Sequence, residues 1–340
     1  MYLLDWSDSA WRGWSRTTEL YQLLAIIRLK NAVQLEMQPF PRRARPFWAW
    51  FPLPILLLIA IGCRRFLPSW GFMWALAFAI YFGVKWLTWW KARDIVPHTR
   101  GRSLAYLLAW PGMDAVAFLN KGHRPSKPKA RQWLWASGKT CFGIVLLWVC
   151  VRIVPPDFPL ARGWVGLFGL IFLLHFGSFH LAGLGWQALG VSAQPIMQSP
   201  ASSHSLSEFW GRRWNLGFRQ LSHDLLFQPL RRPLGVAATT FLVFLFSGLI
   251  HELVISVPAH GGYGLPTGYF LLQGFGVLFE RSRIGRYLGL QSGVRGWTLM
   301  AFLTAAPIRF LFRTPFITRV ILPFLQAIRS EEHTSELQSR

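Results

Sequence analysis

Eight apolar segments that match or approach the length of a membrane-spanning helix constrain this sequence more than any other feature. A helix that crosses the hydrocarbon core of a bilayer needs about 20 mostly apolar residues, with a range of roughly 17–25. The candidate segments are 47–63, 66–84, 139–155, 164–189, 234–257, 264–280, 296–312 and 315–328. The sequence therefore predicts an all-α fold, a multi-pass transmembrane bundle of about eight spans.

The composition agrees with this fold class. Hydrophobic residues make up 52% of the 340 residues, aromatic residues 16% and charged residues only 15%. A soluble domain has about 25% charged residues, so this chain has too few to cover a soluble surface. Disorder, a fibrous repeat and a secreted disulfide scaffold are excluded on the same grounds.

A further apolar segment, 104–119, is too short to span. It is interrupted by Pro111 and Gly112 and carries Asp114. Because irregular backbone within a membrane must be shielded by protein or water, we expect this segment to be re-entrant or to form an interfacial helix.

The apolar region, 47–328, is flanked by two segments of different character. Residues 1–46 are mostly polar and predict a cytoplasmic or interfacial N-terminal segment, in which 18–30 has the spacing of a surface helix. Residues 329–339 read RSEEHTSELQS and resemble a translated sequencing adapter. We therefore expect 329–340 to be an artefactual tail outside the fold, and the natural C-terminus to be missing.

The charge is strongly basic, with 36 Lys and Arg against 14 Asp and Glu. In a soluble protein this excess would suggest nucleic acid, but here the basic residues lie between apolar spans, so we predict no nucleic-acid partner. With eight spans, the basic loops share one side of the membrane with the N-terminus, whereas 258–263 on the other side has no Lys or Arg; Arg64 and Arg65 are the exception. Positive loops stay inside, which predicts a cytoplasmic N-terminus and cytoplasmic large loops. Those loops are 85–138, 190–233 and 281–295.

His251 is the most unusual residue of the apolar spans, because it lies within the predicted span 234–257, beside Glu252. Ionisable groups at this depth are costly and usually face a cavity or a partner. A neutral imidazole is the least costly of them and can accept a proton. Ser247, one helical turn earlier, could hydrogen-bond it. The alternative is a histidine that only packs between helices.

The histidines of the apolar spans do not fit a metal site. His251, Glu252 and Leu253 read HEL, but a zinc-protease motif needs a second histidine four residues on, where this sequence has Ile255. His175 and His180 point about 140° apart on one helix, a poor geometry for one metal. We predict no metal site.

Residues 205–215, SLSEFWGRRWN, form the second unusual segment. Ser205 and Glu208 fit a capping box that begins a helix. Arginines are suited to phosphates, and tryptophans four residues apart can form an apolar wall. The segment predicts an anion-binding helix beside the membrane, and the alternative is an interfacial helix whose arginines only reach for headgroups. The residues concerned are Trp210, Arg212, Arg213, Trp214 and, beyond them, Arg219.

The two segments together, FWGRRWN at 209–215 and SGLIHEL at 247–253, resemble the membrane-bound O-acyltransferase superfamily, in its wax synthase-like branch. The resemblance implies that 47–328 is a transmembrane acyltransferase domain. It also implies that Asn215 and His251 form the active site, and that Trp210, Arg213 and Trp214 line the donor side.

This resemblance suggests an enzyme that transfers a fatty acyl group from acyl-CoA to the hydroxyl of a lipophilic alcohol. His251 would remove the hydroxyl proton, and Asn215 would hold the thioester or stabilise the oxyanion. Arg212, Arg213 and Arg219 would hold the CoA phosphates. The expected partners are acyl-CoA, the alcohol and membrane lipid, with no cofactor. A transporter or flippase of a lipid-linked anion and a non-catalytic scaffold remain as alternatives.

Overall fold

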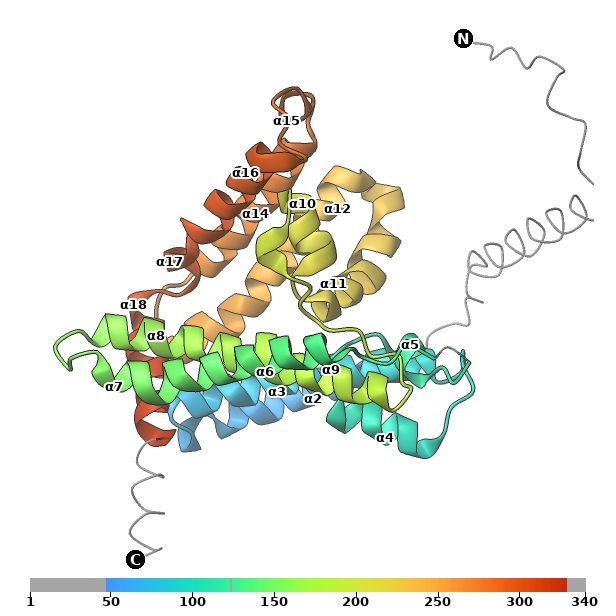
Figure 1. Cartoon of the computed structure of the whole chain (residues 1–340), viewed down its shortest axis with the longest axis horizontal. Helices are drawn as coiled ribbons and strands as arrows, with labels where there is room; N and C mark the ends of the chain where they lie inside the picture. Colours follow the sequence, from blue (N-terminus) through green and yellow to red (C-terminus); the bar gives the residue numbers. More distant parts are fainter. Residues whose placement is uncertain (1–46, 123, 329–340) are drawn as a thin grey trace, which may run out of the picture. The chain divides into compact units, whose positions relative to one another are not determined.

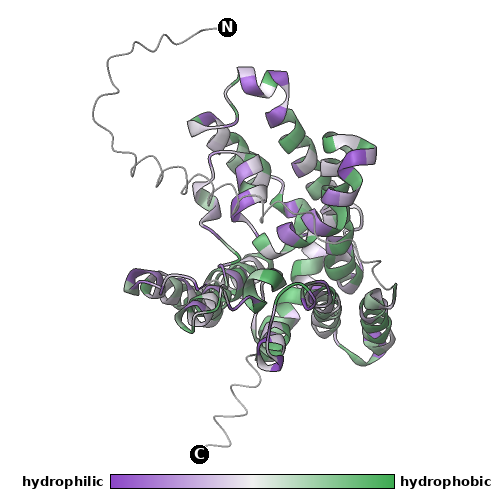
Figure 2. Cartoon of the chain, turned by 90° about the vertical axis from the view of Figure 1, so that its right-hand side faces the viewer, coloured by the Kyte–Doolittle hydropathy of each residue, from purple (hydrophilic) through white to green (hydrophobic). Residues whose placement is uncertain are grey.

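The computed structural model describes residues 47–122 and 124–328, and all regular secondary structure in these ranges is helical. The predictions for 1–46 and 329–340 lie outside the described residues. Figure 1 shows the helices in chain order, and Figure 2 shows that hydrophobic residues dominate most of them. The protein is an all-α, multi-pass membrane bundle.

Five helices among the described residues are long and apolar enough to cross a membrane. They correspond to the first five predicted spans, and they are Phe47–Phe66, Ser69–Ala92, Ala130–Ile153, Pro159–Ala188 and Leu216–Ala259. The last three predicted spans form shorter helices. These are α14 (Leu265–Arg281), α16 (Gly293–Ala305) and the apolar helix Thr314–Ile328.

The first two spans form a helical hairpin. A short 3₁₀ turn at Phe47–Trp50 precedes α2 (Pro52–Gly62), and a second at Cys63–Phe66 leads to α3 (Ser69–Ala92). Pro52 occupies the first turn of α2, where a missing N–H removes no helical hydrogen bond. Gly83 of α3 lies so close to Leu53 that a Cβ there would overlap the Leu53 backbone.

The segment 104–119 is broken where the sequence predicts it to be. It forms α4 (Arg100–Ala109) and α5 (Ala115–Leu119), separated at Pro111-Gly112, and Asp114 caps α5. Lys85, fully buried on α3, donates to the Gly112 carbonyl and lies 3.5 Å from the centroid of the Tyr106 ring. The irregular backbone between α4 and α5 is therefore hydrogen-bonded to a spanning helix, as a membrane requires.

The third and fourth spans pack through glycines. They comprise α6 (Ala130–Val145), a π-helical turn (Leu146–Cys150) and α7 (Val151–Ile153), then α8 (Pro159–Ile171), a second π-helical stretch (Phe172–Ser178) and α9 (Phe179–Ala188). A Cβ at Gly143 of α6 would overlap the Leu173 backbone, and one at Gly169 of α8 would overlap Leu147. Small residues allow this close approach of helices.

The polar connection after α9 leads to the two elements that form the site. A 3₁₀ turn (Pro200–Ser202) precedes α10 (Leu206–Glu208), a π-helical turn (Phe209–Arg213) and α11 (Leu216–Ser222); a further π-helical stretch (His223–Phe227) joins α11 to α12 (Gln228–His251). Within α12, Pro233 is followed by Gly235, whose φ of 78° breaks the helix. The straight part of α12 thus begins where the sequence predicts the span 234–257 to begin.

The chain continues from α12 into the helices that pack against it. A π-helical turn (Glu252–Ser256) and α13 (Val257–Ala259) complete the span, and α14 follows after a short loop. The remaining elements are α15 (Arg283–Tyr287), α16, α17 (Ile308–Leu311), α18 (Thr314–Phe316) and a π-helical stretch (Ile317–Ile321). The predicted span 296–312 is interrupted between α16 and α17 at Pro307, because proline lacks the N–H that a helix interior needs.

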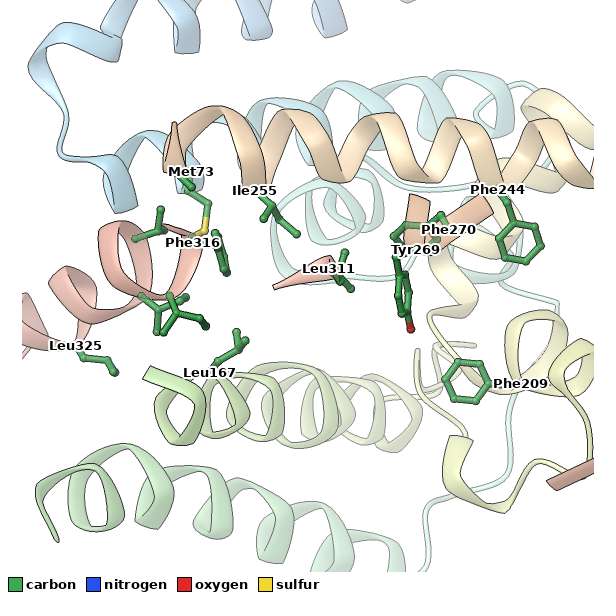
Figure 3. Close-up of a cluster of buried hydrophobic side chains, with 14 of the residues drawn as sticks. Met73, Leu167, Phe209, Phe244, Ile255, Tyr269, Phe270, Leu311, Phe316 and Leu325 are labelled. Atoms are coloured by element: carbon green, nitrogen blue, oxygen red, sulfur yellow. The ribbon is translucent and has the colours of Figure 1, made fainter. Parts of the chain in front are cut away.

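Helices α12 and α14 pack closely in antiparallel fashion. Gly248 lies against Thr267 near the start of α14, and Phe244 lies against Gly274 further along it. The largest buried hydrophobic cluster joins these helices to α3, α8 and the C-terminal helix, as the labelled side chains of Figure 3 show. The core thereby fixes the two helices whose facing sides form the site.

Candidate active site

A pocket of about 440 Å³ lies between α11, α12, α14 and the FWGRRWN segment. Most of its wall is apolar, and it contains five of the seven residues that the sequence predicts for the site. The lining residues that enter the argument below are Ser207, Trp210, Trp214, Asn215, Arg219, His223, Thr240, Ser247, His251, Phe270 and Arg281.

The lining residues of α12 follow helical spacing. Thr240, Val243, Phe244, Ser247, Ile250 and His251 recur at intervals of three and four and so occupy one face. From Thr240 to His251 this face is about 16 Å long, at a rise of about 1.5 Å per residue. Because α14 runs antiparallel, Phe270 lies at the His251 end, and Arg281 lies about 16 Å away at the Thr240 end.

His251 is held in one orientation. Its Nδ1 lies 2.7 Å from the carbonyl oxygen of Ser247, and since a carbonyl can only accept, Nδ1 carries the proton. The neutral ring then has an unprotonated Nε2. Its ring centroid lies 4.3 Å from that of Phe270 in the pocket wall. The predicted contact with Ser247 therefore exists, through the backbone and not the hydroxyl.

Asn215 lies where the FWGRRWN segment turns into α11. Its φ of 40° is left-handed, a conformation that asparagine tolerates better than most residues. The side-chain Oδ1 caps α11 by accepting from the N–H of Phe218 at 3.1 Å. No hydrogen bond within the described residues engages Nδ2, so Asn215 both caps a helix and offers an amide donor at the pocket wall.

Both predicted tryptophans line the pocket. Trp210 packs against Phe244 and Phe270, with ring centroids 5.7 Å apart in each case, and its Nε1 donates to Gln273 at 3.3 Å. Trp214 stacks on Phe209 at 5.4 Å. The two side chains form the apolar wall that their spacing predicts.

Arg212 and Arg213 are not among the lining residues of the pocket. Arg212 is exposed. Arg213 donates from Nε to Glu208 at 2.7 Å and from Nη1 to Ser202 Oγ at 2.9 Å, with a longer contact to the Gln198 carbonyl. Arg213 therefore holds the 198–202 loop to the FWGRRWN segment, a position that does not support its predicted place on the donor side.

Glu208 belongs to the same network. Its Oε2 accepts from the N–H of His204 at 2.7 Å, and Ser205 Oγ accepts from the N–H of Glu208 at 3.0 Å, which realises the predicted helix start. The His204 N–H and then the Arg213 guanidinium hold the pKa of Glu208 below its ordinary value.

The cationic groups at the pocket come from two helices. Arg219 of α11 and Arg281 at the end of α14 are both exposed and both line the pocket, with His223 one turn after Arg219. Arg281 donates from Nε to Ser207 Oγ at 2.9 Å. Sequence reasoning used Arg281 only as a topology signal and missed its place in the site, because only the packing of α14 brings it there.

Glu252 faces away from the pocket lining, toward α14. Its Oε1 accepts from both the N–H and the hydroxyl of Thr267, each at 3.1 Å. The first four backbone N–H groups of a helix lack helical partners, so Glu252 ties α12 to the start of α14. The sequence alone assigns Glu252 no role, and this contact gives it a structural one.

The other intramembrane histidines do not join the site. His175 and His180 are absent from the pocket lining, and the His175 ring packs edge-on against Phe179 at 5.5 Å. In the ranges 47–122 and 124–328, no three His, Cys, Asp or Glu side chains are grouped closely enough to hold a metal ion.

Comparison with known proteins bears on the segment that forms this site. Residues 193–272 match the family described as membrane bound O-acyl transferase family, and this range contains both Asn215 and His251. The resemblance noted from the two motifs is therefore confirmed for this part of the chain.

Curated relatives also match part of the chain. A probable long-chain-alcohol O-fatty-acyltransferase 9 from Arabidopsis thaliana is 39% identical over 75 residues, which are 20% of this chain and 22% of the relative. The long-chain-alcohol O-fatty-acyltransferase of Simmondsia chinensis is 34% identical over 96 residues, 25% of this chain and 27% of the relative. The matches thus span about a quarter of these relatives' length.

Proposed function

We propose that this protein transfers a fatty acyl group from acyl-CoA to the hydroxyl of a long-chain or otherwise lipophilic alcohol. The observation that carries the proposal is the 2.7 Å contact between His251 Nδ1 and the Ser247 carbonyl oxygen, which assigns the ring proton to Nδ1. An unprotonated Nε2 in a mainly apolar pocket is a suitable general base for an alcohol. The names of the relatives, which are long-chain-alcohol O-fatty-acyltransferases, support the same substrates.

The dimensions of the pocket support acyl-CoA as the donor. Exposed Arg281 lies at the Thr240 end of the α12 face, and His251 lies at the other end, about 16 Å along the helix. Exposed Arg219 of α11 adds a second guanidinium to the pocket lining. Acyl-CoA needs such a separation, because a long arm stands between its phosphates and its thioester. Guanidinium groups bind phosphates with charge-assisted hydrogen bonds.

The reaction follows from the placement of two groups, His251 and Asn215. His251 Nε2 takes the proton of the alcohol, and the alcohol oxygen attacks the thioester carbonyl carbon. Asn215 Nδ2 donates to the oxyanion that forms there, a contribution typically worth a few kcal/mol. The tetrahedral intermediate then expels the CoA thiolate, which receives the proton from His251 and leaves as the thiol. No cofactor enters these steps.

The proposed orientation places the N-terminus and the large basic loops in the cytoplasm, so that acyl-CoA enters past Arg219 and Arg281. Contacts from two arginines qualify the charge asymmetry between the loops. Arg64 Nη2 lies 3.1 Å from His260 Nδ1, and Arg319 donates to the Ala259 and His260 carbonyls. Arginines from other segments therefore contact the loop 258–263, although the loop has no arginine of its own.

The experiment is an ester-forming assay on membranes that contain the protein. Labelled acyl-CoA is incubated with a panel of lipophilic alcohols, and the labelled product is identified. We expect an ester whose formation depends on both the alcohol and His251. Transport of the labelled substrate without thioester cleavage would instead support the transporter alternative, which the acyltransferase match does not favour.

A further inference from the structure

Ser207 is hydrogen-bonded to two consecutive residues at the end of α14. Its backbone N–H donates to Glu280 Oε2 at 3.2 Å, and its Oγ accepts from Arg281 Nε at 2.9 Å. The same Glu280 oxygen accepts from the N–H of Leu206 at 2.6 Å. Because backbone N–H groups at the start of a helix lack helical partners, these bonds hold the start of α10 on α14.

Close packing keeps this contact in place. Glu280 is 1% exposed, and Leu206 is fully buried. Gly276 lies one helical turn before Glu280, and a Cβ there would stand 2.7 Å from Leu206 Cδ2. The backbone of Ser207 is therefore fixed, and its hydroxyl gives the exposed Arg281 side chain a fixed acceptor.

The bond to Ser207 uses only one part of the Arg281 guanidinium. A guanidinium has five N–H donors, one on Nε and four on the two Nη groups, and Ser207 takes the Nε–H. In the ranges 47–122 and 124–328, no hydrogen bond engages either Nη group of Arg281, and no carboxylate forms a salt bridge with it. The four Nη donors are thus available to a ligand of the pocket that Arg281 lines.

The neighbouring arginines differ from Arg281. Arg213 uses both Nε and Nη1 on protein oxygens and is paired with Glu208. Arg219 lines the pocket, with a 3.5 Å contact from Nη1 to the adjacent Gln220. Of these three arginines, Arg281 alone combines an anchored Nε with Nη groups that no described residue engages.

We propose that Ser207 is a positioning residue, which holds Arg281 so that its two Nη groups bind a phosphate of the acyl donor. This role rests on the proposed function. Two parallel N–H donors match two phosphate oxygens, and a side chain ordered in advance loses less entropy on binding. Arg281 lies about 16 Å from the His251 end of the pocket, so the contact affects donor binding and not proton transfer.

The test is steady-state kinetics with two donors that carry the same acyl group, acyl-CoA and acyl-pantetheine, which has no phosphate. Arg281→Gln should raise KM for acyl-CoA at least about tenfold, because charge-assisted hydrogen bonds are lost. Ser207→Ala should raise it about two- to tenfold, because one long side chain must then be ordered on binding. For Ser207→Ala, KM for acyl-pantetheine and kcat with both donors should stay within about twofold of the wild type.

Three comparisons isolate the effect of Ser207 on Arg281. Ser207→Thr keeps the hydroxyl, and its KM for acyl-CoA should stay within about twofold of the wild type. In the Arg281→Gln background, Ser207→Ala should cause no further rise, because Ser207 acts only through Arg281. Arg283→Gln is the matched control: it removes another exposed arginine that does not line the pocket, and it should leave KM unchanged.

Four results would overturn the assignment. They are an unchanged KM of Ser207→Ala for acyl-CoA, an equal rise with acyl-pantetheine, an additive rise in the double variant, and the same rise in Arg283→Gln. Calorimetric titration with CoA, in the absence of an alcohol, separates this role from the proposed reaction. If the wild type binds CoA but transfers no acyl group, the proposed function fails, and weaker CoA binding by Ser207→Ala still supports the positioning role. If the wild type does not bind CoA, both fail.

Discussion

Substitution of Arg213 tests whether this residue binds the acyl donor or holds the site together. The motif places it on the donor side, whereas the structure ties it to Glu208 Oε1 at 2.7 Å and to Ser202 Oγ at 2.9 Å. Arg213→Ala removes both contacts. Hydrogen bonds to charged groups contribute about 1.5–3 kcal/mol each, and these are discounted because the Arg213 and Glu208 side chains are 26% and 24% exposed.

The expected loss for Arg213→Ala is therefore about 2 kcal/mol of folding free energy. At an unfolding entropy of about 2.1 cal/mol/K per residue, a chain of 340 residues then melts about 3 °C lower. The measurement is thermal unfolding of the purified protein, followed by tryptophan fluorescence, together with acyl-CoA kinetics. Arg212→Ala, at the exposed neighbouring position, should melt like the wild type.

The melting temperature and the KM for acyl-CoA together decide whether Arg213 stabilises the site or binds the donor. We expect Arg213→Ala to lower the melting temperature and, through Asn215, to reduce kcat. A variant that melts like the wild type but has a raised KM for acyl-CoA would refute this reasoning and restore Arg213 as a donor ligand.

Three further substitutions test other parts of the account. Asn215→Gly keeps the left-handed φ of 40° at little cost, so the variant should fold but lose most of its activity. A kcat near that of the wild type would show that Asn215 only caps a helix. Gly248→Ala places a Cβ 2.8 Å from the Thr267 Cα and should lower the folding free energy by about 1–3 kcal/mol. Gly268→Ala is the control, because a Cβ there meets open space, and it should not destabilise the protein in the same unfolding assay. The fold depresses the pKa of Glu208, so its ionised form stabilises the protein above the ordinary pKa of 4.5. That contribution is lost as the pH falls below this value. The stability of Glu208→Gln should therefore depend less on pH during acid unfolding. An unchanged pH dependence would show that ionised Glu208 does not stabilise the protein.

Much of the fold follows from hydrophobic patterning alone. The first five predicted spans correspond to helices of spanning length, because each is part of a long and mostly apolar stretch. The prediction for 296–312 ignored Pro307, which ends the helical run between α16 and α17. Segment length and mean hydropathy do not reveal such a break.

The site was predictable only in part. His251 and Asn215 stand out as polar residues in unusual surroundings, and both line the pocket. Arg281 could not be found in this way, because an exposed arginine is ordinary in sequence. Its significance depends on how α14 lies against α12, which only tertiary structure provides.

The central claim is that Nε2 of His251 removes the proton of the alcohol. Its direct test is the single-turnover rate of ester formation by purified His251→Gln. His180→Gln serves as a control, since His180 is an intramembrane histidine that does not line the pocket. General-base catalysis is typically worth 10²–10⁴-fold, so we expect His251→Gln to lose at least about a hundredfold in rate while melting like the wild type. A folded His251→Gln variant that forms the ester at a rate within about tenfold of the wild type would contradict the claim.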